Sequence, residues 1–170
     1  MSKNALVRKA KLIAQAMVPA LGALVGDAAM ADELSYFDQR SDPAELVRSY
    51  YNALNRHEYA RAWSYWGADG KPDQSFDDFV SGFEGTLFVD VYVGNVQSEG
   101  AAGSTFHAVP IAINAWQEDG TATAFAGCFF LRMAQPAIQE PPFEGLHLYE
   151  ASLEQVSEPY FVNLPDSCAP

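Results

Sequence analysis

The sequence predicts an α+β fold, in which three N-terminal helices pack on a strongly bent, four-stranded antiparallel sheet. Between residues 42 and 84, apolar residues recur at the spacing of helices that bury one face. After Thr86 they alternate with a period of two, which is typical of strands. Helices followed by strands indicate an α+β layout. The strands are long for so small a domain, and long strands favour a sheet that bends around the helices.

Each of the three predicted helices carries one mostly aromatic stripe. The first is predicted to begin at Pro43, because Asp42 can cap it and proline suits the first helical position. The third is predicted to follow a capping box formed by Ser75 and Asp78. The three stripes consist of Leu46, Val47, Tyr50, Tyr51 and Leu54, then of Tyr59, Ala62, Trp63 and Trp66, and then of Phe76, Phe79, Val80 and Phe83.

Four strands are predicted after the helices. Pro110 lies inside the second strand, which indicates an edge or a bulge, and Gly120 ends a hairpin turn before the third. Residues 98–104, rich in Gly, Ala and Ser, are predicted to form a turn. The strands are expected near 87–94, 105–116, 121–133 and 146–156, with core faces that include Leu87, Val89, Val91 and Val93 in the first and Val109, Ile111 and Ile113 in the second.

The chain is acidic, with a net charge of −12 over its 170 residues. Four of the ten basic residues lie in the first eleven positions, so the part from Asp32 onward has 6 basic and 21 acidic residues, a net charge of −15. Binding to phosphates requires a basic surface, so nucleic acid is excluded as a partner. An anionic membrane surface is excluded for the same reason.

The first 31 residues predict a secretory signal peptide. A basic start is followed by an apolar run at residues 12–25 and by small residues at Ala29 and Ala31. A transmembrane anchor needs about 20 apolar residues, whereas this run is shorter and contains Gln15 and Pro19. We therefore expect cleavage after Ala31 and a periplasmic or secreted chain without a membrane span.

Two cysteines, Cys128 and Cys168, predict one disulfide in an oxidising compartment. The bridge would tie down the end of the chain. The alternative is a catalytic thiol, but Cys128 has no helix N-terminus or basic neighbour to activate it. We expect a signal peptide at 1–31, a domain at 42–157 and a tail at 158–170.

Several segments resemble nuclear-transport-factor-2-like domains, also called ketosteroid-isomerase-like, SnoaL-like or cystatin-like α+β rolls. The run at 47–55, the aromatic positions from Tyr59 to Trp66, and the strands at 125–132 and 149–153 carry the resemblance, and residues 75–83 are similar to a segment of exported bacterial members. The resemblance covers about residues 42–157. It implies a bent sheet around a cone-shaped cavity used for isomerisation, dehydration, hydrolysis or binding. It also implies that a homodimer can form through the sheet.

Two residues are candidates for a general base, since enzymes with this fold place a carboxylate or histidine in an apolar cavity. Asp90 lies mid-strand, although the outer face of the sheet suits it better. His107 shares its face with Val109, which points it toward the core side. The alternative for His107 is a satisfied buried histidine or one at the wet end of the strand.

The remaining candidates concern ligand binding. Tyr51, Trp63 and Trp66 are predicted to line a pocket, although aromatic stripes are more often simply core. Arg132 is predicted to meet an anionic group of a ligand or to form an ion pair, for which Glu150 is one partner. No metal or cofactor signature is recognised: the histidines at 57, 107 and 147 and the cysteines lack metal-ligand spacing.

These observations favour an exported, non-enzymatic binding or accessory domain with a small apolar cavity. Its partner would be a small apolar ligand or an envelope protein. One alternative is an enzyme of the isomerase or dehydratase type that uses His107 or Asp90 as its base. The other is an envelope domain that binds proteins through its sheet and takes no ligand.

Overall fold

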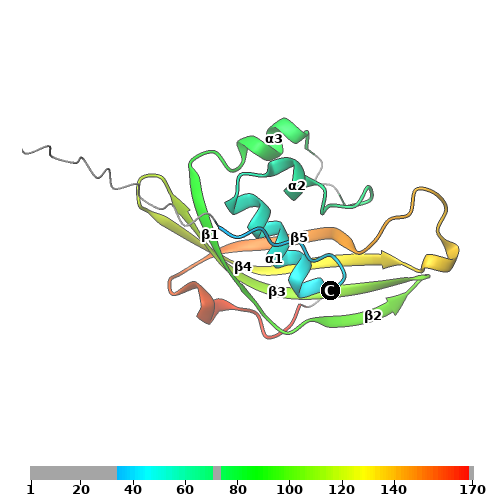
Figure 1. Ribbon diagram of the computed structural model, residues 1–170. Coiled ribbons are helices and arrows are strands. Elements are labelled where there is room, and N and C mark those ends of the chain that lie inside the picture. Colours follow the sequence, from blue (N-terminus) through cyan, green and yellow to red (C-terminus); the bar gives the residue numbers. More distant parts are fainter. Residues whose placement is uncertain (1–33, 71–73, 169–170) are drawn as a thin grey trace, which may run out of the picture. The chain divides into compact units, whose positions relative to one another are not determined.

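A computed structural model describes residues 34–70 and 74–168, in which helices lie on one face of an antiparallel sheet (Figure 1). This arrangement confirms the predicted α+β fold class. No helix in these two ranges is long and apolar enough to cross a membrane. The predicted signal peptide lies outside the described residues.

The elements follow the predicted order of helices before strands. The described helices and strands are α1 (Pro43–Asn55), α2 (Tyr59–Trp63), α3 (Phe76–Ser81), β1 (Thr86–Val93), β2 (Gln97–Ala101), β3 (Ser104–Gln117), β4 (Ala122–Ala134), η1 (Pro136–Ile138), β5 (His147–Val156) and η2 (Tyr160–Asn163).

The helices begin where the capping residues predict. The Asp42 side chain accepts a hydrogen bond from the Glu45 backbone N–H at 3.0 Å, and α1 starts at the next residue, the proline. Ser75 and Asp78 form the predicted capping box of α3. The second helix is shorter than its aromatic stripe, because the chain leaves the helix after Trp63 and pairs with β5 instead.

The sheet has five strands in the described part of the chain, one more than predicted. Its order is β1-β3-β4-β5, and β2 pairs with β3 beside β1. The turn predicted at residues 98–104 is therefore largely strand. Only Ala102 and Gly103 turn the chain, and both have positive φ, as a two-residue hairpin of the primed type requires. The strand was missed because its residues, Gln-Ser-Glu-Gly-Ala, are all exposed and have weak strand propensity.

Pro110 lies in the central strand β3, not in an edge strand. Its backbone position faces the gap between β1 and β2, where Gly94 N–H donates to the Pro110 carbonyl at 2.8 Å. A proline has no N–H to pair. The break between β1 and β2 therefore accommodates it without leaving an unpaired donor.

The core lies between the helices and the inner face of the sheet. Val109, Ile111 and Ile113 of β3 are buried there, as the alternating pattern predicts. Leu87, also expected in the core, is 51% exposed because a bulge between Thr86 and residue 88 changes its direction. Asn55 at the end of α1 exchanges two hydrogen bonds with the Val89 backbone, of 2.7 and 2.9 Å. These bonds fix α1 against the open edge of β1.

The end of the chain crosses the face of the sheet opposite the helices, where it is coloured red in Figure 1. Cys128 of β4 and Cys168 form the predicted disulfide, which closes a separation of 40 residues. Near it, the Cys168 backbone N–H donates to the Gln97 side chain of β2 at 3.2 Å, and η2 packs on β3 and β4. The tail therefore covers part of the surface through which a homodimer is expected.

We expect the substitution Cys168→Ser to release the tail while the helices and the sheet keep their structure. Loss of a bridge over 40 residues lowers the free energy of unfolding by at most about 4 kcal/mol in the chain-entropy model. Hydrogen exchange read by mass spectrometry should speed up at residues 157–168 and stay slow in α1 and β3. Equal acceleration in α1 would contradict this account.

Candidate functional site

An apolar cleft lies between the helices and the inner face of the sheet. It consists of two adjoining recesses of about 480 and 430 Å³, which share Tyr50, Trp66, Gly82, Phe83 and Ala151. The larger recess is also lined by Tyr51, Leu54, Glu84, Thr86, Val89, Ile113, Ala115, Gln117, Thr123, Phe125, Phe129 and Leu153.

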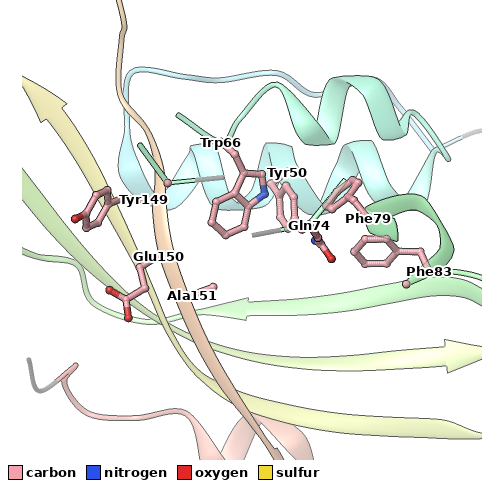
Figure 2. Close-up of a pocket in the computed structure, with 10 residues that line it drawn as sticks. Tyr50, Trp66, Gln74, Phe79, Phe83, Tyr149, Glu150 and Ala151 are labelled. Atoms are coloured by element: carbon pink, nitrogen blue, oxygen red, sulfur yellow. The ribbon is translucent and has the colours of Figure 1, made fainter. Parts of the chain in front are cut away.

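The smaller recess is shown in Figure 2. The rings of Trp66, Phe79 and Phe83 come from the helical layer, and β5 runs down the picture to their left. The Glu150 carboxylate on β5 points away from these rings in this view. The space between the two layers is therefore bordered by aromatic faces, while the charged group lies toward solvent.

Four aromatic rings form the inner wall of the cleft. Trp66 and Phe129 have centroids 6.1 Å apart, and Tyr50 meets both edge to face, at 6.1 and 5.8 Å. Tyr51 contacts Phe129 at 6.1 Å. Inclined pairs of this kind contribute about 0.5–1.5 kcal/mol each beyond the area they bury. The wall is thus a rigid surface formed by α1, the segment after α2, and β4.

The wall also holds polar groups. Burial raises the pKa of Tyr50 and of Tyr51 well above the usual tyrosine value. The Trp66 indole N–H lies near the Tyr50 hydroxyl, which offsets part of that rise. The two do not reach hydrogen-bond geometry, so the buried N–H has no partner among the described residues. Such a donor costs about 1–3 kcal/mol.

The cleft has little that can transfer protons. No histidine occurs among the described residues that line it. Its two carboxylates, Glu84 and Glu150, are both exposed. A general base tuned toward neutral pH requires a buried or charge-coupled group. The described lining of the cleft therefore offers mostly apolar side chains and two exposed carboxylates.

Three solved structures illustrate what this chain is similar to. A conserved protein from Planctomyces limnophilus matches with a TM-score of 0.50 and 8% identity, over 65% of this chain and 92% of that one. A candidate dehydratase from the NTF2-like family of Streptomyces avermitilis has a TM-score of 0.45 and 11% identity, over 66% and 92%. A candidate aromatic-ring hydroxylase from Novosphingobium aromaticivorans has a TM-score of 0.48 and 14% identity, over 66% of this chain and 89% of that one.

The fold is nuclear-transport-factor-2-like. The resemblance found in the sequence and the helices packed on an open antiparallel sheet agree on this point, and the Planctomyces limnophilus protein shares the fold at a TM-score of 0.50. Neither the models of known protein families nor the curated protein sequences contain a match to this chain. At 8–14% identity the likeness describes the fold, and the activities named above are those of the other proteins.

The cleft of this NTF2-like domain contains two of the five predicted pocket residues. Tyr51 and Trp66 line it. Trp63 does not: its ring packs against Phe76 and Phe79 of α3, with centroids 5.9 and 5.0 Å apart. The helix ends at Trp63, so the two tryptophans do not share one helical face. His107 and Arg132 also lie outside both recesses.

The two predicted general bases are on different surfaces. His107 shares the strand face of Val109 but lies nearer the end of β3, where its Nδ1 is 2.7 Å from the Ser98 hydroxyl. Burial lowers its pKa, and the nearby Asp42 opposes that shift. Asp90 accepts a hydrogen bond from the Trp116 indole at 2.9 Å. Neither residue is among those that line the cleft.

Arg132 has a different partner from the one the sequence suggested. A bulge in the pairing of β4 with β5, after Phe130, places Arg132 opposite His147. Its guanidinium forms an ion pair with Asp69 and donates to the Ser104 hydroxyl. The ion pair that the sequence suggested is therefore present, with Asp69 as its partner, while Glu150 lies opposite Phe130.

Sequence reasoning missed the cleft residues that the sheet supplies. Phe125 and Phe129 fall on one face of the predicted third strand, and Ile113 on the core face of the second. The pattern therefore places them on the correct face, but it cannot separate core from cavity wall. That distinction depends on how far the helices lie from the sheet, which is a long-range property.

We expect Trp66→Phe to be tolerated far better than Trp66→Ala. The alanine variant removes a ring that is 8% exposed and should cost roughly 3–5 kcal/mol in free energy of unfolding. The phenylalanine variant keeps the wall and removes an unpaired buried N–H, so its stability should stay within about 1 kcal/mol of the wild type. Urea denaturation of both variants measures the difference, and equal losses would show that the indole N–H is needed.

Proposed function

We propose that this chain is an exported, non-enzymatic binding or accessory domain that holds a small, mostly apolar molecule in its NTF2-like cleft. The carrying observation is the larger recess, about 480 Å³ in volume, with walls formed by aromatic and aliphatic side chains. Ligand pockets in proteins are typically about 300–1,000 Å³ and mostly apolar, with a few polar groups that orient the ligand.

The side chains that line the larger recess indicate which chemical class of ligand it would bind. Phe125 and Phe129 of β4 and Leu153 of β5 form its floor, and aromatic side chains of α1 face them. Polar groups such as Gln117 and Thr123 belong to the same recess and can meet one polar end of a ligand. A flat ring system or a short acyl chain with one oxygen fits this distribution.

Binding without catalysis is supported by the composition of the lining. The described lining residues include two exposed carboxylates, and both histidine and buried acidic groups are missing from it. The predicted bases His107 and Asp90 belong to other surfaces. A reaction in the cleft would need a proton acceptor that these side chains do not supply.

Export is supported by the sequence and by the disulfide. The first 31 residues have the pattern of a signal peptide. Cys128 and Cys168 are bonded, and structural disulfides persist in oxidising compartments such as the periplasm. The exported protein would begin at Asp32 and act outside the cytoplasm.

Binding of N-phenyl-1-naphthylamine, a neutral apolar dye that fluoresces when it leaves water, tests the proposal. Protein recovered from the exported fraction should take up the dye saturably. The variant Ala115→Phe places a ring in the larger recess and should weaken the affinity at least tenfold, about 1.4 kcal/mol. The matched variant Ala137→Phe adds the same ring at an exposed position outside the cleft and should bind as the wild type does.

Thermal melts establish that both variants are folded before their affinities are compared. Dye binding that is equally strong in Ala115→Phe would place the dye elsewhere and contradict the cleft. Absence of any saturable uptake by the wild type would also overturn the proposal. The interaction protein without a ligand would then be the better description.

A further inference from the structure

A group of three side chains with metal-ligating atoms lies at one end of β5, outside the lining of the cleft. Asp69 comes from the loop after α2, Glu144 from the loop before β5, and His147 is the first residue of that strand. One ligating atom from each lies within 4.8 Å of the other two. No motif in the sequence indicates this group, because 78 positions separate the aspartate from the histidine.

The loop after α2 is fixed against β5 by its backbone. Gly67 N–H donates to the Leu148 carbonyl at 3.1 Å, and Leu148 N–H donates to Tyr65 at 2.8 Å. Ala68 N–H donates to the Glu144 carboxylate at 2.8 Å. These hydrogen bonds hold the carboxylates of Asp69 and Glu144 close to the His147 ring.

The His147 ring is buried and held in one orientation. The residue is 6% exposed. Gly67 packs directly on the ring, since a Cβ on that glycine would lie 2.2 Å from a ring carbon. Only a glycine allows this approach. An imidazole fixed in this way is preorganised, so little rotamer entropy is lost when it binds a ligand.

Both nitrogens of the ring face oxygen atoms. Nδ1 is 2.8 Å from the Gly145 carbonyl, and Nε2 is 3.0 Å from Oδ1 of Asp69. A carbonyl only accepts, so Nδ1 carries a hydrogen and donates it. The Nε2 lone pair of a neutral ring would then face a carboxylate. Nε2 and Oδ1 are thus directed at each other, as two atoms that bind one metal ion are.

The pattern around Nδ1 is that of a metal-ligating histidine. Such residues donate the hydrogen of their other nitrogen to a carbonyl or carboxylate, which fixes the tautomer. Arg132 binds Oδ2 of Asp69, so the other oxygen, Oδ1, remains directed at the ring. Two carboxylates and one guanidinium leave one excess negative charge before the ring is counted, which favours a cation at this place.

We propose that Asp69, Glu144 and His147 bind one divalent transition-metal ion of the zinc class. Imidazole nitrogen with two carboxylate oxygens suits Zn²⁺, whereas Ca²⁺ and Mg²⁺ prefer sites made of oxygen. Tetrahedral zinc ligands at about 2.0–2.2 Å lie about 3.3–3.6 Å apart, so the three ligating atoms, which lie within 4.8 Å of one another, move closer together when the ion binds. Three protein ligands leave a fourth position for water.

Zinc titration of the full chain, purified after removal of metals with a chelator, tests this site. Calorimetry should show one Zn²⁺ per chain, and Mg²⁺ at the same concentration should give no comparable heat. Glu144→Gln keeps an acceptor for Ala68 N–H and loses the charged ligand, so zinc should bind at least tenfold more weakly. His147→Gln should have the same effect or a larger one.

The matched control is His57→Gln, since this histidine is exposed and its ring contacts Tyr59 instead. It should bind zinc as the wild type does. Replacement of zinc by Co²⁺ gives an independent measurement. The wild type should show the visible absorption of Co²⁺ bound by nitrogen and oxygen ligands, and Glu144→Gln should not. Equal zinc binding in Glu144→Gln would overturn the proposal, as would loss of binding in His57→Gln or no saturable binding by the wild type. Because Glu144 is only half-buried, the Glu144→Gln variant tests the zinc site even if His147→Gln fails to fold.

Discussion

The contact of Tyr50, Trp66 and Phe129 is the interaction on which the rest of this structure depends. The three rings belong to α1, to the segment after α2 and to β4, and each contacts the other two. Because large rings meet at steep angles, they keep the helical layer away from the sheet while burying apolar surface between the two. The cleft is the space that remains beside this contact.

The helical layer is hydrogen-bonded to the sheet at the two edges of the sheet. At the β1 edge, Asn55 bonds to both backbone groups of Val89. At the β5 edge, the segment around Trp66 pairs with Leu148. Open sheet edges expose unpaired backbone groups, and these hydrogen bonds at the two edges satisfy some of them. A layer held at its two sides can span a cavity between them without collapsing into it.

The fold was predictable because its signals are local. Stripes at helical spacing, the caps at Asp42 and Ser75, and the change of period after Thr86 each depend on a few neighbouring residues. The disulfide followed from the presence of two cysteines. The strand β2 was not predicted because all five of its residues are exposed, so they show no alternating pattern of burial. For the same reason, the turn was placed too early.

The site was less predictable because it depends on contacts between distant residues. Trp63 and Trp66 are three positions apart, yet one packs on α3 and the other in the cleft, since the helix ends between them. The Asp69 pairing with Arg132 and His147 follows from a strand bulge and a loop that passes the edge of β5. No local pattern contains that information.

Xenon binding to crystals of the wild-type protein tests the central claim most directly. Xenon enters dry apolar cavities and is seen by its strong scattering, and engineered apolar cavities bind it. The account predicts a xenon site in the larger recess, beside Phe83, Phe125 and Phe129. A recess closed by contact of these rings, with no xenon in it, would contradict the claim that the aromatic wall holds the cleft open.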